Sequence, residues 1–388
     1  MALPDVLINL QNGGLGRIAF ADDRVVGLVL NGTPRAPFMV RSMDDYFDIV
    51  NPTRVVQTSY GLYWQQQVQD FFLAAGEGAE LWVMIVDPTV SLADLFTGTT
   101  ITTLMEAAEG RLNVIGVSRL LEAETPTLTE GLHPDTLAGM DEAFAWAEAQ
   151  NTLHRPCRIL LDGKFLDPAL ANLRNLKTHT FNRVGVVVGT NRAGRNAAMG
   201  LALGSIAAIP VHQNLGRFRN GSLPISEAYT TNNIAVKANS TQAVTLDQKG
   251  YIFLRKYPNQ AGYYWVGDHM ACADTDDFNS LANGRVADKV ARLLYTNLLP
   301  ELLDNVPVDT ETGKIPATWV KNLQGKLDRA ISLGMITNGE SEISGVTTFI
   351  DPAQDILALS KLEVTCRVTP LGLARDIVVT LGFYNPNA

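Results

Sequence analysis

The chain has 388 residues, of which 46% are hydrophobic and 18% are charged, a composition that is ordinary for a soluble globular protein and excludes a disordered chain. Its length allows two or three domains. The formal net charge is −9 and no run of Lys or Arg interrupts the acidic balance, so we expect no nucleic-acid partner.

The first residues of the chain predict an extended arm. Val6, Ile8 and Leu10 alternate with their neighbours at the strand period, and the glycine-rich stretch 13–16 then breaks the strand. So short a terminal strand has no stability alone and must pair with another strand. No basic region precedes an apolar stretch, so we expect no signal peptide. The same glycines lack the context of a nucleotide loop. We therefore predict a linker arm over residues 1–22.

The middle of the chain predicts an α/β domain over residues 23–240. Apolar runs predict strands at residues 81–86, 112–117, 158–161 and 184–188. Helical patterns occupy residues 91–109, a stretch that begins at Pro134, residues 168–176 and residues 196–209. Short apolar strands separated by helices are typical of a mostly parallel sheet with both faces covered. The apolar run 197–211 is shorter than the ~20 residues of a membrane-spanning helix, so we expect no membrane insertion.

The last third of the chain predicts an α+β domain over residues 241–370 and a strand arm over residues 371–388. A strand is predicted at residues 251–255, amphipathic helices at 286–298 and 319–331, and closing strands at 362–369 and 377–383. Gly334 occupies the expected position just after the second helix. In the last strand, the apolar residues alternate with their neighbours and are Ile377, Val379, Leu381 and Phe383.

Two segments could carry enzyme chemistry. The turn Gly189–Gly194 lies between a predicted strand and a predicted helix, where open α/β sheets bind phosphates. Its glycine spacing fits a P-loop, but Arg195 and Asn196 stand where Lys and Ser or Thr are needed. A plain βα turn is therefore favoured.

The second segment is an acidic loop. Oxygen ligands for a divalent metal could come from its clustered polar residues, which are Asp268, His269, Asp274, Asp276 and Asp277. The loop lacks the central Gly and distal Glu of an EF-hand, and an ordinary helix start explains the same residues better. The histidines are scattered, and the three cysteines fit reduced thiols of a bacterial-type cytosol. We expect no catalytic constellation, no metal and no cofactor.

The C-terminal third closely resembles the contractile tail sheath proteins of phage tails and contractile injection systems. The stretches that carry this resemblance are Gly284–Leu302, Gly313–Pro316, Leu333–Ile336, Phe349–Pro352, Gln354–Asp355, Thr369–Gly372 and Ala374–Ile377. Upstream, residues 200–218 and 250–270 resemble the compact sheath branch of Bacteroidetes-type bacteria. The earlier part matches only as a succession of elements, a terminal arm and an α/β domain of subtilisin-like topology. No subtilisin-type triad is discernible, so this topology implies no protease.

The resemblance implies a non-enzymatic subunit that polymerises helically around an inner tube and contracts to drive that tube through a target envelope. The implied partners are further copies of the chain, the inner tube protein, and baseplate and tail terminator proteins. The implied location is a virion tail or contractile injection particle assembled in the bacterial cytoplasm. Residues 241–370 would form the inner sheath domain. The alternative is an α/β hydrolase or nucleotide-binding enzyme that uses Gly189–Gly194 or Asp274–Asp277.

Two sets of residues would carry the structural function. A tethered strand can stay paired with a neighbour's sheet while the subunits move, because main-chain hydrogen bonds supply the affinity. We expect this pairing from Val6, Ile8 and Leu10 and from the strand 377–383; the alternative is that both strands complete the sheet of their own chain. A basic helix of sheath relatives faces the acidic tube, and here it would present its basic residues, Lys321, Lys326 and Arg329. A solvated helix face explains the same charges.

Overall fold

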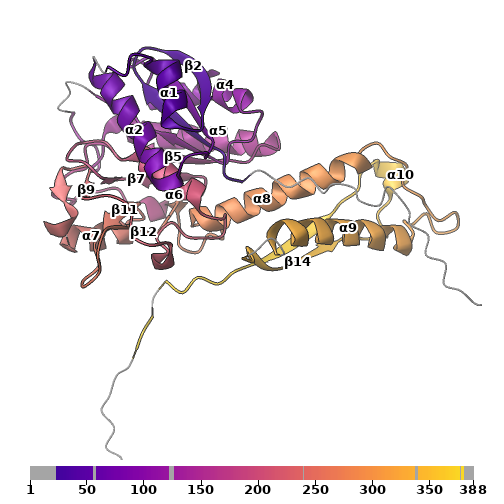
Figure 1. Cartoon of the computed structure of the whole chain (residues 1–388). Coiled ribbons are helices and arrows are strands. Elements are labelled where there is room, and N and C mark those ends of the chain that lie inside the picture. The colour runs from indigo at the N-terminus through magenta and orange to yellow at the C-terminus, as the bar shows by residue number, and fades with distance from the viewer. Residues whose placement is uncertain are drawn as a thin grey trace, which may run out of the picture.

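A computed structural model describes residues 23–55, 58–121, 126–238, 240–336, 340–375 and 377–379. Figure 1 shows a rounded α/β body, two long helices that project from it, and an extended C-terminal segment. The body is built on a six-stranded sheet of order β2-β3-β1-β4-β5-β7. Its strands are β1 (Val26–Asn31), β2 (Arg35–Val40), β3 (Leu81–Val86), β4 (Val114–Val117), β5 (Arg158–Asp162) and β7 (Val184–Val187). All pairs are parallel except β2–β3, so the predicted mixed α/β fold with a mostly parallel sheet is confirmed.

Helices cover both faces of this sheet. One layer holds α1 (Met43–Val50), α2 (Ser59–Ala75) and α6 (Met199–Ala208), and the other holds α3 (Leu92–Thr97), α4 (Thr100–Ala107) and α5 (Pro134–Thr152). Successive side chains of a strand point to opposite faces. Val26 and Leu28 of β1 accordingly pack in the core under α2 and α6, whereas Val29 packs in the core under α3–α5. This two-sided burial is why the strands read as continuous apolar runs.

Short elements extend the body. They are η1 (Leu176–Thr178), β6 (Thr180–Phe181), β8 (Gly189–Thr190), η2 (Phe218–Asn220), β9 (Tyr229–Thr230), β10 (Ile234–Ala235), η3 (Val236–Ala238), α7 (Ser240–Gln248), β11 (Phe253–Arg255), β12 (Tyr264–Val266) and β13 (Ala271–Cys272). Ile252, Phe253 and Trp265 are buried in the same two cores as the large sheet. The division of the chain at residue 240 stays a prediction; in the structure, residues 251–272 pack with the body.

The projecting part contains α8 (Leu281–Leu298), η4 (Leu299–Glu301), α9 (Ala317–Met335), β14 (Ile343–Phe349), α10 (Ile356–Leu359) and β15 (Thr365–Pro370). β14 and β15 form an antiparallel two-stranded sheet. Apolar residues of α8, α9 and this sheet share one core that includes Val290, Ile331 and Ile343. No helix in the described ranges combines the length and apolarity needed to cross a bilayer.

Three predicted helix assignments differ from the structure. The helix predicted at 91–109 is two helices, because Gly98 ends α3 and accommodates a backbone bend before α4. The helix predicted at 168–176 does not form: Leu170 adopts a left-handed φ of 52° and is buried in the core. Gly334 lies inside α9 rather than after it, where a missing side chain allows close contact with Leu293.

The closest contact between helices in the body depends on glycine. Gly200 and Gly204 of α6 face the backbone of α2, and a Cβ atom at Gly200 would lie 1.8 Å from the Gln67 carbonyl oxygen. The backbone amide of Gly200 also donates to Gln67 Oε1 at 2.7 Å. The two helices can therefore approach only because these positions carry no side chain.

Replacing Gly200 with Ala should destabilise the fold by about 1–3 kcal/mol or more, because the helices must separate to admit the methyl group. Thermal or urea-induced unfolding measures this change. The matched control is Gly325→Ala in α9, where a Cβ atom meets nothing within 4 Å. That change should raise stability by roughly 0.5–1 kcal/mol. Equal unfolding midpoints for Gly200→Ala and wild type would refute the packing argument.

Candidate functional site

The junction between the body and the projecting part is ionic and buried. Four charged residues lie on one side of α8 at positions i, i+3, i+4 and i+7, and we call them the ionic stripe: Arg285, Asp288, Lys289 and Arg292. Arg158, at the start of β5, donates from Nε to Asp288 Oδ2 at 2.8 Å and from Nη2 to Asp288 Oδ1 at 3.0 Å. Its remaining donors reach the carbonyl oxygens of Asn182 and Gly284.

Asp288 is shared by two guanidinium groups. Arg183 donates to Asp288 Oδ1 at 3.1 Å and also pairs with Glu148 of α5. Burial alone would raise the pKa of Asp288, but the charges and hydrogen bonds of Arg158 and Arg183 outweigh it and hold this pKa below its usual value. Asp288 therefore stays ionised although it is buried.

The other residues of the ionic stripe contact further segments of the body and of the projecting part. Lys289 Nζ lies 2.6 Å from both Asp23 Oδ2 and Glu342 Oε2, so it joins the chain segment before β1 to the segment before β14. Arg292 donates to the carbonyl oxygens of Gly110, Leu112 and Pro156, which precede β4 and β5. Burial lowers the pKa of Arg285 to about 10, which still leaves it charged at neutral pH. α8 is thereby fixed at the amino ends of β1, β4 and β5 of the large sheet.

The two-stranded sheet of the projecting part is a candidate acceptor for further strands. Its register pairs Val346 with Val368 and Thr348 with Cys366, and apolar residues of its inner face contact the core under α8 and α9. Thr348 anchors β14 to α9 through a backbone bond to Asp328. A sheet of two strands is marginal alone and presents unpaired backbone groups at its edges. Among described residues, no third strand pairs with it.

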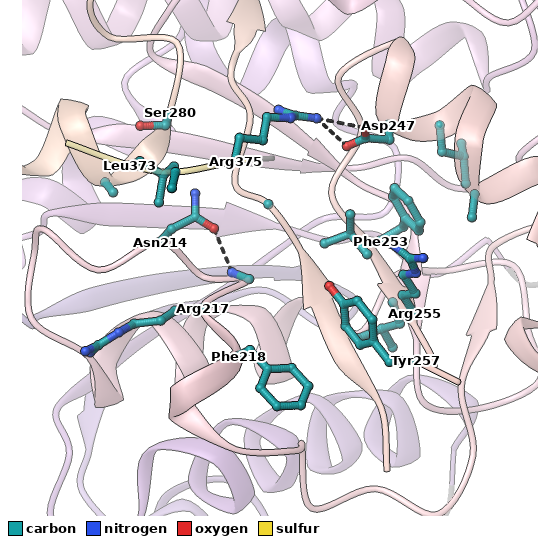
Figure 2. A pocket seen from close by; sticks show the side chains of 18 of the residues that line it. Asn214, Arg217, Phe218, Asp247, Phe253, Arg255, Tyr257, Ser280, Leu373 and Arg375 are labelled. Carbon is teal, nitrogen blue, oxygen red and sulfur yellow. Dashed lines mark hydrogen bonds and ion pairs between the residues drawn. The ribbon is translucent and has the colours of Figure 1, made fainter. Parts of the chain in front are cut away.

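The C-terminal segment after β15 lies over the body without forming a strand. Arg375 Nη2 contacts Asp247 Oδ1 and Oδ2 of α7 at 2.6 and 2.7 Å (Figure 2). Beyond this ion pair, Ile377, Val378 and Val379 are 82%, 91% and 77% exposed. The structure therefore shows no strand at Ile377 and Val379, while Leu381, Phe383 and the N-terminal residues Val6, Ile8 and Leu10 lie outside the described residues.

The predicted basic helix is α9. Lys321, Lys326 and Arg329 are all exposed. By helical spacing, Arg329 lies opposite the buried residues of α9, whereas Lys321 and Lys326 lie at the two edges of that buried stripe. Lys326 donates to Glu301 Oε1 at 2.6 Å. Lys321 and Arg329 form no ion pair with a residue that the structure describes.

The turn Gly189–Gly194 offers no phosphate site in its observed geometry. Gly189 and Thr190 form the short strand β8, and Arg192 pairs with the buried Asp70 of α2. At the following helix start, the Ala197 amide donates to Asp162 Oδ1 at 2.8 Å and the Gly200 amide donates to Gln67. Burial raises the pKa of Asp162 to about 6. The amides that a phosphate needs are thus held by the protein's own side chains.

Polar side chains of the acidic loop likewise form ion pairs and hydrogen bonds with other residues of the chain. Asp274 contacts Lys177 and His269 at 2.9 and 2.8 Å, which hold its pKa low against the effect of burial. Asp276 accepts from Asn182, and the buried Asp268 accepts from the Ala282 amide at the start of α8. Within the described part of the chain, no three His, Cys, Asp or Glu residues are arranged to hold a metal ion. The role of these residues is therefore to stabilise the loop and the start of α8.

The ionic stripe was not predicted from the sequence. The apolar residues of α8 gave a clear helical pattern, and charged residues at the same spacing on the other side resembled a solvated face. The one sequence signal was a lone acidic residue, Asp288, among Arg285, Lys289 and Arg292. Its partner Arg158 lies 130 positions away, so no local pattern could have identified the pair.

Comparisons with known proteins agree with this architecture. The sequence profile of the DUF2586 N-terminal domain matches residues 3–269, and that of the DUF2586 C-terminal domain matches residues 277–388. No curated protein sequence matches the chain significantly.

Three solved structures have the same fold over nearly the whole chain. The contracted helical sheath of the anti-feeding prophage (AFP) is 14% identical with a TM-score of 0.64, covering 98% of this chain and 99% of that one. The contracted PVC sheath complex of an extracellular contractile injection system is 13% identical with a TM-score of 0.55 and 98% coverage of both. A sheath tail protein from Desulfitobacterium hafniense is 11% identical with a TM-score of 0.51, covering 95% and 100%. The chain therefore has the fold of these sheath proteins.

Replacing Asp288 with Asn should destabilise the protein by about 3–5 kcal/mol, because Arg158 and Arg183 would remain buried without their counter-charge. Urea-induced unfolding measures the loss. In wild type, the contribution of Asp288 should be present above the ordinary carboxyl pKa of 3.8 and lost as the pH falls through the lower folded value, and Asp288→Asn should lack this dependence. Glu363→Gln, which breaks the exposed pair with Lys361, is the control and should leave the midpoint unchanged. Equal effects of both variants would contradict a structural role for the ionic stripe.

Proposed function

The chain belongs to the DUF2586 family, and we propose that it is the structural subunit of a contractile tail sheath, which polymerises helically around an inner tube and contracts to drive it. The observation that carries the proposal is the match to the sheath fold over 98% of the chain. The enzyme alternative is not proposed, because the Gly189–Gly194 turn and the Asp274–Asp277 loop use their polar groups internally.

Two sets of contacts within the chain support this proposal. A contracting array must move rigid subunits past one another while keeping them connected. The ionic stripe joins the α/β body to α8, and the apolar core of α8, α9 and β14 joins the rest. Energy would be stored in the metastable extended array and released as intersubunit contacts increase. Such a cycle requires no nucleotide.

We propose that the terminal arms connect neighbouring subunits by strand addition. The donors would be Val6, Ile8 and Leu10 at one end of the chain and Ile377, Val379, Leu381 and Phe383 at the other. The acceptor would be the β14–β15 sheet of a neighbour, whose edges pair with no further strand among the described residues and whose inner face is already packed. Backbone hydrogen bonds give such pairing its affinity, and the tether lets it persist while the bodies move. The high exposure of Ile377 and Val379 supports this assignment, since apolar edges of this kind favour pairing with another chain.

A sheath subunit would also contact the other proteins of the particle. The inner tube would be contacted by α9 through Lys321 and Arg329, whose charges are not used within the described chain, and more weakly by Lys326, which pairs with Glu301. Exposed ionic contacts suit a tube that must be gripped and then released. Baseplate and terminator proteins would contact the two ends of the polymer, in a phage tail or injection particle assembled in the bacterial cytoplasm.

Electron microscopy of the purified protein should show helical tubes or polysheaths. The double variant Ile377→Asp/Val379→Asp should abolish them while leaving a folded monomer by circular dichroism, because the two side chains share one face of the added strand. Val378→Asp, which points to the opposite face, is the matched control and should impair assembly less. A monodisperse small oligomer of the wild type at all concentrations would reject the sheath function. Tubes from the double variant would reject the strand assignment alone.

Reversing Lys321 and Arg329 to Glu should weaken binding to the cognate tube protein by at least about tenfold at low salt, because like charges would then face each other. Co-sedimentation of preassembled tubes with the variant measures this. Lys314→Glu, also an exposed residue of the projecting part, is the control. If both variants bind tubes equally well, α9 is not the contact surface.

A further inference from the structure

A deep groove of net positive charge lies on the body of this acidic protein. It has a cavity volume of about 1240 Å³ and lies between α7, β11, the segment 212–219 and the C-terminal segment (Figure 2). Asp247 is the one acidic residue that lines it, among the residues that the structure describes. Its Lys and Arg residues are Arg217, Arg219, Lys237, Arg255, Lys256 and Arg375. This charge is opposite in sign to the net charge of −9 of the whole chain.

Arg217 pairs with Glu340 at 3.6 Å, but most of the other cations have no counter-charge among the residues that the structure describes. Asp247 is already paired with Arg375, so it does not offset the other cations. Arg219, Lys237 and Lys256 are exposed and form no ion pair with any described residue. An unpaired cluster of like charges is self-repulsive, and an anionic partner would relieve this repulsion.

The groove is also held in shape. Phe218 stacks on Tyr264 with ring centroids 4.7 Å apart, and Tyr257 meets both rings edge to face. The guanidinium of Arg255 lies 4.6 Å from the centroid of the Tyr257 ring. The packed rings therefore orient Arg255 before any partner arrives, which lowers the entropy cost of binding through this residue.

A complementary surface exists on the same chain. The helices α3, α4 and α5 contain six acidic residues and no Lys or Arg. Asp135 and Glu148 are paired with basic residues of the body. Asp94, Glu106 and Asp141 are exposed and form no ion pair with a described residue. The outer surface of these three helices, which we call the acidic face, is therefore an anionic surface of the kind that the groove would bind.

The groove and the acidic face cannot meet within one molecule. No residue of α3–α5 lines the groove, and Figure 1 shows α4 and α7 at opposite sides of the body. Resting on the function proposed above, we propose that the basic groove binds the acidic face of a second copy of this chain. An interface between two different surfaces is heterologous, and its repetition generates an open helical polymer rather than a closed dimer. Electrostatic complementarity of this kind fixes partner orientation and speeds encounter.

The test uses two charge-reversed proteins. The groove variant is Arg219→Glu/Lys256→Glu, and the face variant is Glu106→Lys/Asp141→Lys. Each alone should need at least about tenfold more protein to associate at low salt, because it opposes like charges across the contact. A mixture of the two should associate as wild type does, because each reversed surface then meets its complement. Raising the salt to 0.5 M should reduce all these differences, since exposed charges are screened.

Analytical ultracentrifugation and electron microscopy provide the readouts, with circular dichroism to verify folding. Lys314→Glu/Lys361→Glu changes the net charge equally outside the groove and should associate like wild type. The proposal is overturned if the groove variant associates like this control, if mixing restores nothing, or if the groove variant loses only binding to a labelled oligonucleotide. Restored association on mixing without any tubes would support the groove and reject the sheath function. Tubes from every variant would support the sheath function and reject the proposed binding of the groove to the acidic face.

Discussion

The architecture depends on one buried ion pair, that between Arg158 of β5 and Asp288 of α8. Two charges removed from water cost free energy that their attraction only partly returns, so such a pair adds little net stability over apolar residues of similar volume. What it supplies is specificity, because the bidentate geometry accepts one position of α8 at the amino end of β5. Arg183, Lys289 and Arg292 extend the same restraint along two turns of the helix. From these contacts we infer that the body and the projecting part move together.

If the two parts move together, the movement of contraction takes place at the contacts between subunits. The segment after Pro370 lies over the body, where Arg375 pairs with Asp247, and then exposes the apolar side chains of residues 377–379 to solvent. The two-stranded β14–β15 sheet presents edges that can accept such a strand. Two kinds of contact would join the subunits. Backbone pairing through tethered arms persists while subunits rotate, whereas ionic contacts across exposed surfaces can break and form again. The proposed sheath uses the first to stay connected and the second to change arrangement.

Local sequence patterns predicted much of the fold and little of the junction. The strand β3 and the start of α5 at Pro134 occur as predicted, because an uninterrupted apolar run and a proline at a helix start act over a few residues. Leu170 and Gly334 were misassigned because tertiary contacts, a buried left-handed leucine and a helix packed against Leu293, override local preference. The ionic stripe and the groove join residues far apart in sequence, and only the folded chain brings them together. The strand-pairing residues and the basic helix remain predictions.

High-resolution electron cryomicroscopy of the assembled polymer in both extended and contracted states tests this account most directly. It predicts that Arg158 and Asp288 remain in contact in both states, that the body and α8–β15 superpose as one unit, and that residues 377–383 pair with the β14–β15 sheet of a neighbour. A change in the angle between α8 and the large sheet, with the ion pair broken in one state, would contradict it.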